Sequence, residues 1–139
     1  MSDTMLGGLT MPPCSKLLGW RLIESDPANG RIKVGFDGKR DFCNPSGFIQ
    51  GGFLTAMMDD TMGPAVFVMT EGRQYTPTIT LTVNFLAPAK VGPLICEAKV
   101  VQKGKTVVFV ESKLTDEAGT LIATSTSTSR LVEASKLAR

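Results

Sequence analysis

Polar and apolar residues alternate most strictly between Thr78 and Phe85, where four polar side chains alternate with four apolar ones. A period of two is typical of a β-strand that turns one face toward a core. Shorter β-rich stretches, separated by turns rich in Gly, Pro, Asp and Asn, lie at residues 17–26, 31–37, 94–103, 105–116 and 121–131. The first two predict a hairpin, and the last three, together with 78–85, predict an antiparallel meander of four strands.

The stretch 44–62 shows a different pattern. A turn-forming Asn-Pro-Ser-Gly sequence leads to a pair of glycines that begins at Gly51, and the residues after the pair are largely apolar without alternation. This predicts a buried helix that begins near Gly51. Pro64 cannot donate to the carbonyl of Asp60, so we expect it to kink the helix or end its first part, with 65–69 continuing beyond it. Because apolar residues point in most directions, only a curved sheet or another subunit could enclose this helix.

The order of these elements, a hairpin, one long helix and four strands, indicates a single α+β domain. A chain of 139 residues can bury a core without the help of a metal or a disulfide. We place this domain at residues 17–132, after an N-terminal arm at 1–16 and before a C-terminal tail at 133–139. A short helical turn is considered around Ser15, and Trp20 is expected to be a packing position.

Composition narrows the functions open to the chain. A net charge of +2 and the absence of clustered Lys and Arg give no indication of nucleic-acid binding. The sequence has no histidine, which excludes Ser-His-Asp and Cys-His machinery and every His-ligated metal site. Its three cysteines have no CxxC spacing and fit neither a disulfide framework nor a zinc site. We therefore expect no metal, no cofactor, a cytoplasmic location and, since no signal peptide or spanning segment is evident, no membrane association.

The predicted helix start is the first candidate for chemistry. The first N–H groups of a helix lack partners within it and carry the positive end of its dipole, which favours a carbonyl oxygen or an anion. Gly51 and Gly52 would let a ligand approach the backbone closely. Asp59 follows about two turns later in an apolar segment, so a helix dipole and a nearly buried acid form a candidate hydrolytic site. Its neighbour Asp60 points about 100° away and is expected to face a strand or a subunit interface.

These residues also form a recognisable signature. The pattern Asn-x-x-Gly-x-x-(His or Gln)-Gly-Gly, with an acid nine residues after the His or Gln, is matched by Asn44, Gly47, Gln50, Gly51, Gly52 and Asp59. In this the chain resembles the hot-dog-fold acyl-CoA thioesterases of the phenylacetic-acid-degradation (PaaI-like) type, and the resemblance extends from about residue 17 to 131. It implies a hot-dog fold, in which a curved antiparallel β-sheet wraps a long central helix. It also implies an acyl-CoA substrate and a homodimer that pairs further into a dimer of dimers.

The resemblance assigns a role to each matching residue. The Gly51 N–H would stabilise a developing oxyanion, and Asp59 would act as general base on water or as nucleophile. Asn44 would hold the water or the carbonyl, and Thr78 would orient the acid or its water. Gln50 stands where many relatives have histidine; it can donate a hydrogen bond to the carbonyl but cannot transfer a proton. The acid and Thr78 would come from one subunit and the other three residues from its partner.

The acyl group is not readable from the sequence. Gly52, Phe48, Met58 and Met62 are candidates for contacts with the substrate in an apolar pocket, although core packing accounts for the methionines equally well. An acyl-carrier-protein thioester is a further substrate option. The main alternative function is a non-catalytic acyl-CoA binding or regulatory protein, which would keep the glycine helix start without needing Asp59. A purely structural domain would leave that carboxylate unexplained.

Overall fold

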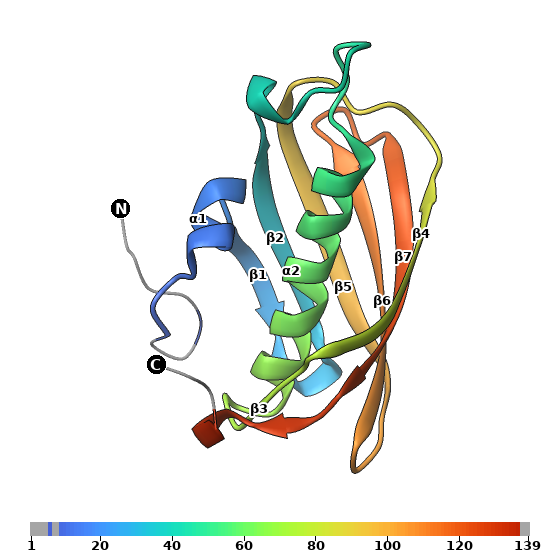
Figure 1. The fold of residues 1–139 in the computed structure, drawn as a ribbon. Coiled ribbons are helices and arrows are strands. Elements are labelled where there is room, and N and C mark those ends of the chain that lie inside the picture. Colours follow the sequence, from blue (N-terminus) through green and yellow to red (C-terminus); the bar gives the residue numbers. More distant parts are fainter. Residues whose placement is uncertain (1–5, 7–8, 137–139) are drawn as a thin grey trace.

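One long helix, α2 (Gly51–Met69), lies against a six-stranded antiparallel sheet that curves around it (Figure 1). The computed structural model describes residue 6 and residues 9–136. A second, short helix, α1 (Pro13–Leu18), precedes the first strand. This arrangement confirms the predicted architecture of a central helix wrapped by an antiparallel sheet.

The strands follow in chain order as β1 (Arg21–Asp26), β2 (Arg31–Gly38), β3 (Gln74–Tyr75), β4 (Thr78–Phe85), β5 (Gly92–Lys103), β6 (Val107–Asp116), β7 (Leu121–Arg130) and β8 (Val132–Glu133). The main sheet has the order β1-β2-β5-β6-β7-β4, and β3 pairs separately with β8. Short 3-10 turns are found at Pro27–Asn29, Arg40–Phe42 and Ala134–Lys136. The predicted hairpin β1–β2 is confirmed, as are the pairings of β5 with β6 and of β6 with β7.

The position of β4 differs from the predicted meander. β4 pairs with β7 and does not form a hairpin with β5. The connection at residues 86–91 contains Pro88 and passes the start of α2, where the carbonyl of Ala89 accepts the N–H of Ile49 at 2.8 Å. The chain thus crosses from one edge of the sheet to its middle (Figure 1). As a result β4 lies at the edge of the sheet.

The first strand is also shorter than the predicted 17–26. Helix α1 occupies residues up to Leu18, and Gly19 ends it in the left-handed conformation with φ 75°. A Cβ at Gly19 would collide with the carboxylate of Asp37, so both the backbone angle and the space require glycine. The helical turn considered around Ser15 is therefore α1 itself, and Ser15 is buried.

The core lies between α2 and the inward face of the sheet. Fully or almost fully buried side chains come from α2 (Met57, Met58, Met62 and Val66) and from the strands (Val34, Phe36, Leu94, Val108, Val110, Leu114 and Ile122). Side chains of this size each stabilise a fold by about 1.5–3 kcal/mol when fully buried. The helix continues through Pro64 to Met69, so the proline does not end it. In the described part of the chain, no helix is both long enough and apolar enough to cross a membrane.

Candidate active site

The carboxylate of Asp59 and the hydroxyl of Thr78 meet between α2 and the edge strand β4. The Thr78 Oγ1 donates a hydrogen bond to Asp59 Oδ1 at 2.9 Å. Asp59 lies in the middle of α2 and Thr78 is the first residue of β4. Both residues are exposed in the single chain, so the expectation of a nearly buried acid at Asp59 is wrong. The hydrogen bond fixes the orientation of the carboxylate. The structure therefore brings together two of the five residues predicted to be catalytic.

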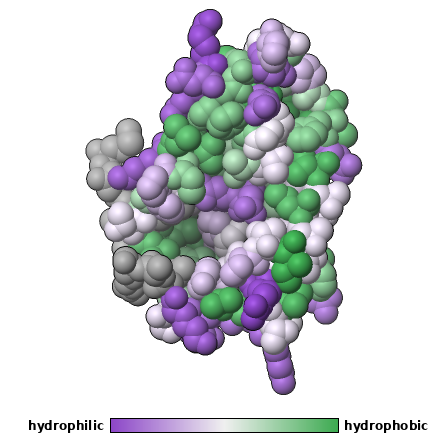
Figure 2. Space-filling model, in the orientation of Figure 1, coloured by the Kyte–Doolittle hydropathy of each residue, from purple (hydrophilic) through white to green (hydrophobic). Residues whose placement is uncertain are grey.

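The surface over α2 has a mixed character. Figure 2 shows hydrophilic residues gathered near the middle of the face that carries this helix, with hydrophobic areas above them and toward β4. The exposed large apolar residues of β4 and the connection after it include Ile79, Phe85 and Leu86. A polar centre beside an exposed apolar edge is typical of a surface that a ligand or another chain covers.

The amino end of α2 offers backbone donors. Gln50 caps the helix through its carbonyl, which accepts the N–H groups of Phe53 at 3.0 Å and Leu54 at 3.3 Å. Among the described residues nothing accepts the N–H of Gly51 or Gly52, and the first turn contains no acidic side chain. Both N–H groups can therefore bind a carbonyl oxygen or an anion. The predicted helix start at Gly51 is confirmed.

Close packing explains the first of the two glycines. A Cβ at Gly51 would lie 2.9 Å from Cζ of the Phe85 ring, which is closer than carbon atoms approach each other. Phe85 is the last residue of β4, so one end of the edge strand touches the start of α2. At Gly52, the Oε1 of Gln50 lies 3.4 Å from the position of a Cβ, so the exposed Gln50 side chain lies beside this residue. Sequence reasoning missed Phe85; its only signal is its place at the end of the alternating strand.

Asn44 organises the loop that leads to α2. Its Oδ1 accepts the N–H groups of Ser46 at 3.0 Å and Phe48 at 3.2 Å, and its own N–H donates to the Phe48 carbonyl at 2.7 Å. Gly47 closes the turn with φ 84°, a conformation that favours glycine. Because two N–H groups already occupy the side-chain oxygen, the amide NH2 is the part of Asn44 suited to an external carbonyl or water.

A pocket of about 450 Å³ opens at the amino end of α2. Its lining comprises Asn44, Phe48, Ile49, Gly51, Leu54 and residues 85–89. The structure thus places Asn44, Phe48 and Gly51 around one open pocket with both polar and apolar surface. Met58 and Met62 lie elsewhere, because they are on the sheet-facing side of α2, only 0% and 2% exposed. The Sδ of Met62 accepts a hydrogen bond from Ser125 Oγ at 3.5 Å, and both methionines belong to the core.

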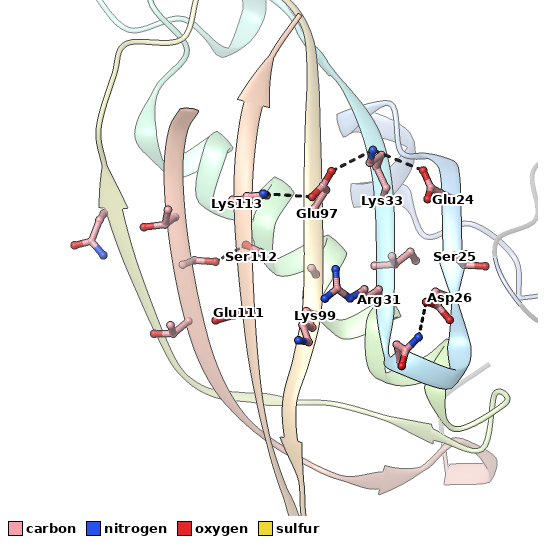
Figure 3. Close-up of a pocket in the computed structure, with 17 residues that line it drawn as sticks. Glu24, Ser25, Asp26, Arg31, Lys33, Glu97, Lys99, Glu111, Ser112 and Lys113 are labelled. Carbon is pink, nitrogen blue, oxygen red and sulfur yellow. Dashed lines mark hydrogen bonds and ion pairs between the residues drawn. The ribbon is translucent and has the colours of Figure 1, made fainter. Parts of the chain in front are cut away.

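A larger pocket of about 900 Å³ lies on the opposite face of the sheet (Figure 3). Lys33 forms ion pairs there with Glu24 at 3.6 Å and Glu97 at 3.1 Å, and Glu97 also pairs with Lys113 at 3.6 Å. Burial alone would raise the pKa of Glu97, but Lys33 and Lys113 lower it below its ordinary value. None of the predicted site residues lines this pocket. Exposed ion pairs of this kind contribute little to stability, about 0–1 kcal/mol each.

Asp60 packs against α1 and not against a strand, which was one of its two expected surroundings. Its Oδ2 accepts a hydrogen bond from Ser15 Oγ at 2.7 Å, and its backbone carbonyl accepts one from Trp20 Nε1 at 2.9 Å. Burial raises the pKa of Asp60 from 3.8 to about 6; the Ser15 hydrogen bond lowers it and the charge of Asp59 raises it further. The prediction that Trp20 is a packing position is correct, since it is 5% exposed, but its N–H also has a specific partner.

A curved antiparallel sheet around one long helix, with backbone donors at the helix start and a carboxylate in its middle, defines a hot-dog-fold domain. The model of the thioesterase superfamily matches residues 46–123, more than half of the chain. The chain belongs to this superfamily.

Individual relatives agree with this assignment. A candidate esterase from Saccharolobus solfataricus is 35% identical over 92 residues, which span 66% of this chain and 65%, slightly under two thirds, of that protein. Human acyl-coenzyme A thioesterase 13 is 30% identical over 98 residues, 69% of each chain. The crystal structure of a candidate thioesterase from Ralstonia eutropha JMP134, described as phenylacetic acid degradation-related, superposes with a TM-score of 0.84 at 31% identity. This superposition covers 89% of this chain and 93% of the other. The resemblance to PaaI-like thioesterases is thereby confirmed.

Proposed function

We propose that this protein is an acyl-CoA thioesterase in which Asp59 acts as the acid–base or nucleophilic residue and the Gly51 N–H polarises the thioester carbonyl. The observation that carries the proposal is the Thr78–Asp59 hydrogen bond of 2.9 Å, which orients an exposed carboxylate on a largely apolar helix. The name of the human relative, an acyl-coenzyme A thioesterase, supports CoA as the thiol carrier.

Two copies of the chain are needed to complete this site. Gly51 and Asp59 are eight residues apart on one helix, which corresponds to about 12 Å along its axis. A carboxylate or its bound water must lie about 3 Å from the carbonyl carbon that the helix start polarises. The two groups of a single chain therefore cannot act on the same thioester.

The edge strand β4 supports a way for two copies to pair. Antiparallel pairing of β4 with the β4 of a second copy would place the Thr78 end of one strand beside the Phe85 end of the other. Because Thr78 is bonded to Asp59 and Phe85 touches Gly51, this pairing would bring the acid of one copy to the helix start of the other. It would also cover exposed apolar residues and provide hydrogen-bond partners for the backbone N–H and C=O groups along the edge of β4. A homodimer with two such composite sites follows, and further pairing into a dimer of dimers is part of the proposal.

In the proposed reaction, water first attacks the thioester and the thiol of CoA then leaves. Asp59 takes a proton from water while the water oxygen bonds to the thioester carbon, and the carbonyl electrons move to the oxygen. The Gly51 N–H, with the amide groups of Asn44 and Gln50, donates to this oxyanion; one such donor is worth roughly 10²–10³ in rate. Collapse breaks the C–S bond, and the thiolate of CoA receives the proton from Asp59. If Asp59 attacks directly, its carboxylate oxygen bonds to the carbonyl carbon, the C–S bond breaks and CoA leaves as the thiolate. Water then hydrolyses the resulting mixed anhydride, which regenerates Asp59, and a proton of that water goes to the thiolate.

The test is release of free CoA thiol from phenylacetyl-, benzoyl-, short-chain and medium-chain acyl-CoAs. Asp59→Asn should lower kcat by about 100-fold or more, because the amide cannot accept the proton. Glu117→Gln, an exposed residue in the β6–β7 turn, is the matched control and should retain full activity. Tight acyl-CoA binding without turnover in the wild type would instead favour the non-catalytic binding protein. Equal turnover in wild type and Asp59→Asn would remove Asp59 from the mechanism.

A further inference from the structure

The hydrogen-bond ladder of α2 is interrupted next to Asp59. In a regular helix the carbonyl of Asp60 would accept the N–H of the residue four positions later, but that residue is Pro64, which has no N–H. The indole N–H of Trp20 takes this place, with Nε1 2.9 Å from the Asp60 carbonyl oxygen. A donor from another element thus replaces the missing helical bond.

The same segment also holds the side chain of Asp60. Ser15, which is completely buried, donates its hydroxyl to Asp60 Oδ2 at 2.7 Å. Residues 15–20, here called the 15–20 segment, therefore fix Asp60 at both its main chain and its carboxylate. Figure 1 shows α1, which contains the first part of this segment, beside the central part of α2.

The 15–20 segment is itself anchored to the sheet side of the molecule. The backbone N–H of Trp20 donates to the Ser15 carbonyl at 3.0 Å, which closes the carboxyl end of α1. Lys39 Nζ donates to the carbonyl of Leu17, and Gly19 packs tightly against Asp37 of β2. Because the 15–20 segment is held in place, its hydrogen bonds also restrain the turn of α2 that contains Asp60.

We propose that the 15–20 segment positions the catalytic carboxylate, with Ser15, Trp20 and Asp60 as positioning residues for Asp59. The inference rests on the proposed function. Asp59 and Asp60 share a peptide bond. The two hydrogen bonds to Asp60 therefore also restrict the position of the Asp59 backbone, from which its side chain extends. Without the Trp20 bond the turn before Pro64 has one unsatisfied carbonyl and more freedom to bend. A displacement of about 1 Å at a reacting group can cost 100-fold in rate.

The sharpest test is a double-mutant cycle between Trp20 and Pro64. Trp20→Phe removes the N–H but keeps an aromatic ring in the core, and should lower kcat about tenfold with KM changed less than about twofold. Pro64→Ala gives the helix its own N–H for the Asp60 carbonyl. In the Pro64→Ala background the Trp20→Phe change should therefore cost less than about twofold in kcat. Equal losses in both backgrounds, or a change in KM alone, would overturn the proposal.

A second series examines the carboxylate bond. Ser15→Ala and Asp60→Leu remove the bond and should lower kcat several-fold, whereas Asp60→Asn keeps an acceptor for Ser15 and should retain most of the wild-type kcat. Cys14→Ala, which alters an exposed neighbour on α1, is the matched control. If Asp60→Asn loses as much activity as Asp60→Leu, a bond-based positioning role is wrong.

Amide hydrogen exchange separates this inference from the proposed function. Trp20→Phe should speed exchange at residues 58–63, and adding Pro64→Ala should reverse the effect. If the wild type hydrolyses no thioester, the proposed function fails, and this measurement still decides whether the 15–20 segment holds the turn. Unchanged exchange in Trp20→Phe would show that it does not.

Discussion

The two sides of α2 carry neighbouring aspartates in opposite environments. Toward β4, Asp59 is exposed and accepts a hydrogen bond from Thr78, in a place where a substrate could reach it. Toward α1, Asp60 is largely buried, bonded to Ser15, and has a pKa raised by burial to about 6. Consecutive side chains of a helix point about 100° apart, so the two carboxylates contact different elements. The exposed surroundings suit Asp59 to the proposed chemistry, whereas the buried surroundings suit Asp60 to a structural role.

The largest effect expected from this contrast is a pH-dependent stability that belongs to Asp60. Its pKa is 3.8 in ordinary surroundings and about 6 in the fold, so the folded state keeps the proton longer than the unfolded state. The contribution of Asp60 to stability is therefore full below about pH 4 and is lost as the pH rises through 6. The loss is on the order of 3 kcal/mol.

Asp60→Asn removes this titration. The free energy of unfolding in urea, measured at several values between pH 4 and pH 7.5, should rise for the variant relative to the wild type as the pH increases. Using the difference between the two proteins cancels the groups that they share. A difference that stays constant across this range would show that Asp60 is not the buried acid described here.

A smaller effect is expected at Thr78, on the opposite side of the helix. Thr78→Val keeps the shape but removes the hydrogen bond to Asp59, and kcat should fall by at least about tenfold because a bond to a charged group is worth about 1.5–3 kcal/mol. Thermal stability should change little, since the pair is exposed. Thr78→Ser keeps the hydroxyl and should retain activity. If valine and serine behave alike, the hydroxyl does not orient the acid.

The smallest effect is expected at a third kind of carboxylate, on the outer face of the sheet. Glu97 is paired with Lys33 and Lys113 in a region open to solvent (Figure 3). Glu97→Gln should change the free energy of unfolding by less than about 1 kcal/mol, with the difference shrinking in high salt. Thioester hydrolysis should be unaffected. A large loss of activity would mean that the larger pocket, and not the one beside α2, belongs to the site.

Local pattern predicts much of this molecule. The glycine pair correctly places the helix start at Gly51, and the strict alternation from Thr78 correctly predicts β4. The partner of β4 could not be read in the same way. Leu81 lies opposite Ser127 across a long sequence separation, and alternation shows which face of a strand is buried but not which strand lies beside it.

The candidate site shows the same limit. The structure brings Asp59 and Thr78 together as the family resemblance implies, and the sequence also predicts that Pro64 deprives the Asp60 carbonyl of its helical donor. Nothing in the local sequence indicates that Trp20, 40 residues earlier, replaces that donor. Nor does an apolar spacing distinguish methionines that line a pocket from methionines that fill a core, and Met58 and Met62 belong to the core.

The edge position of β4 has a genetic consequence in the proposed dimer. Each site draws its acid from one copy and its helix start from the other, so a cell that makes two different defective copies can regain function. A chain without a working Asp59 and a chain without a working Gly51 would each be inactive alone. Assembled together, they would restore one complete site in each mixed pair, so the two defects would complement each other.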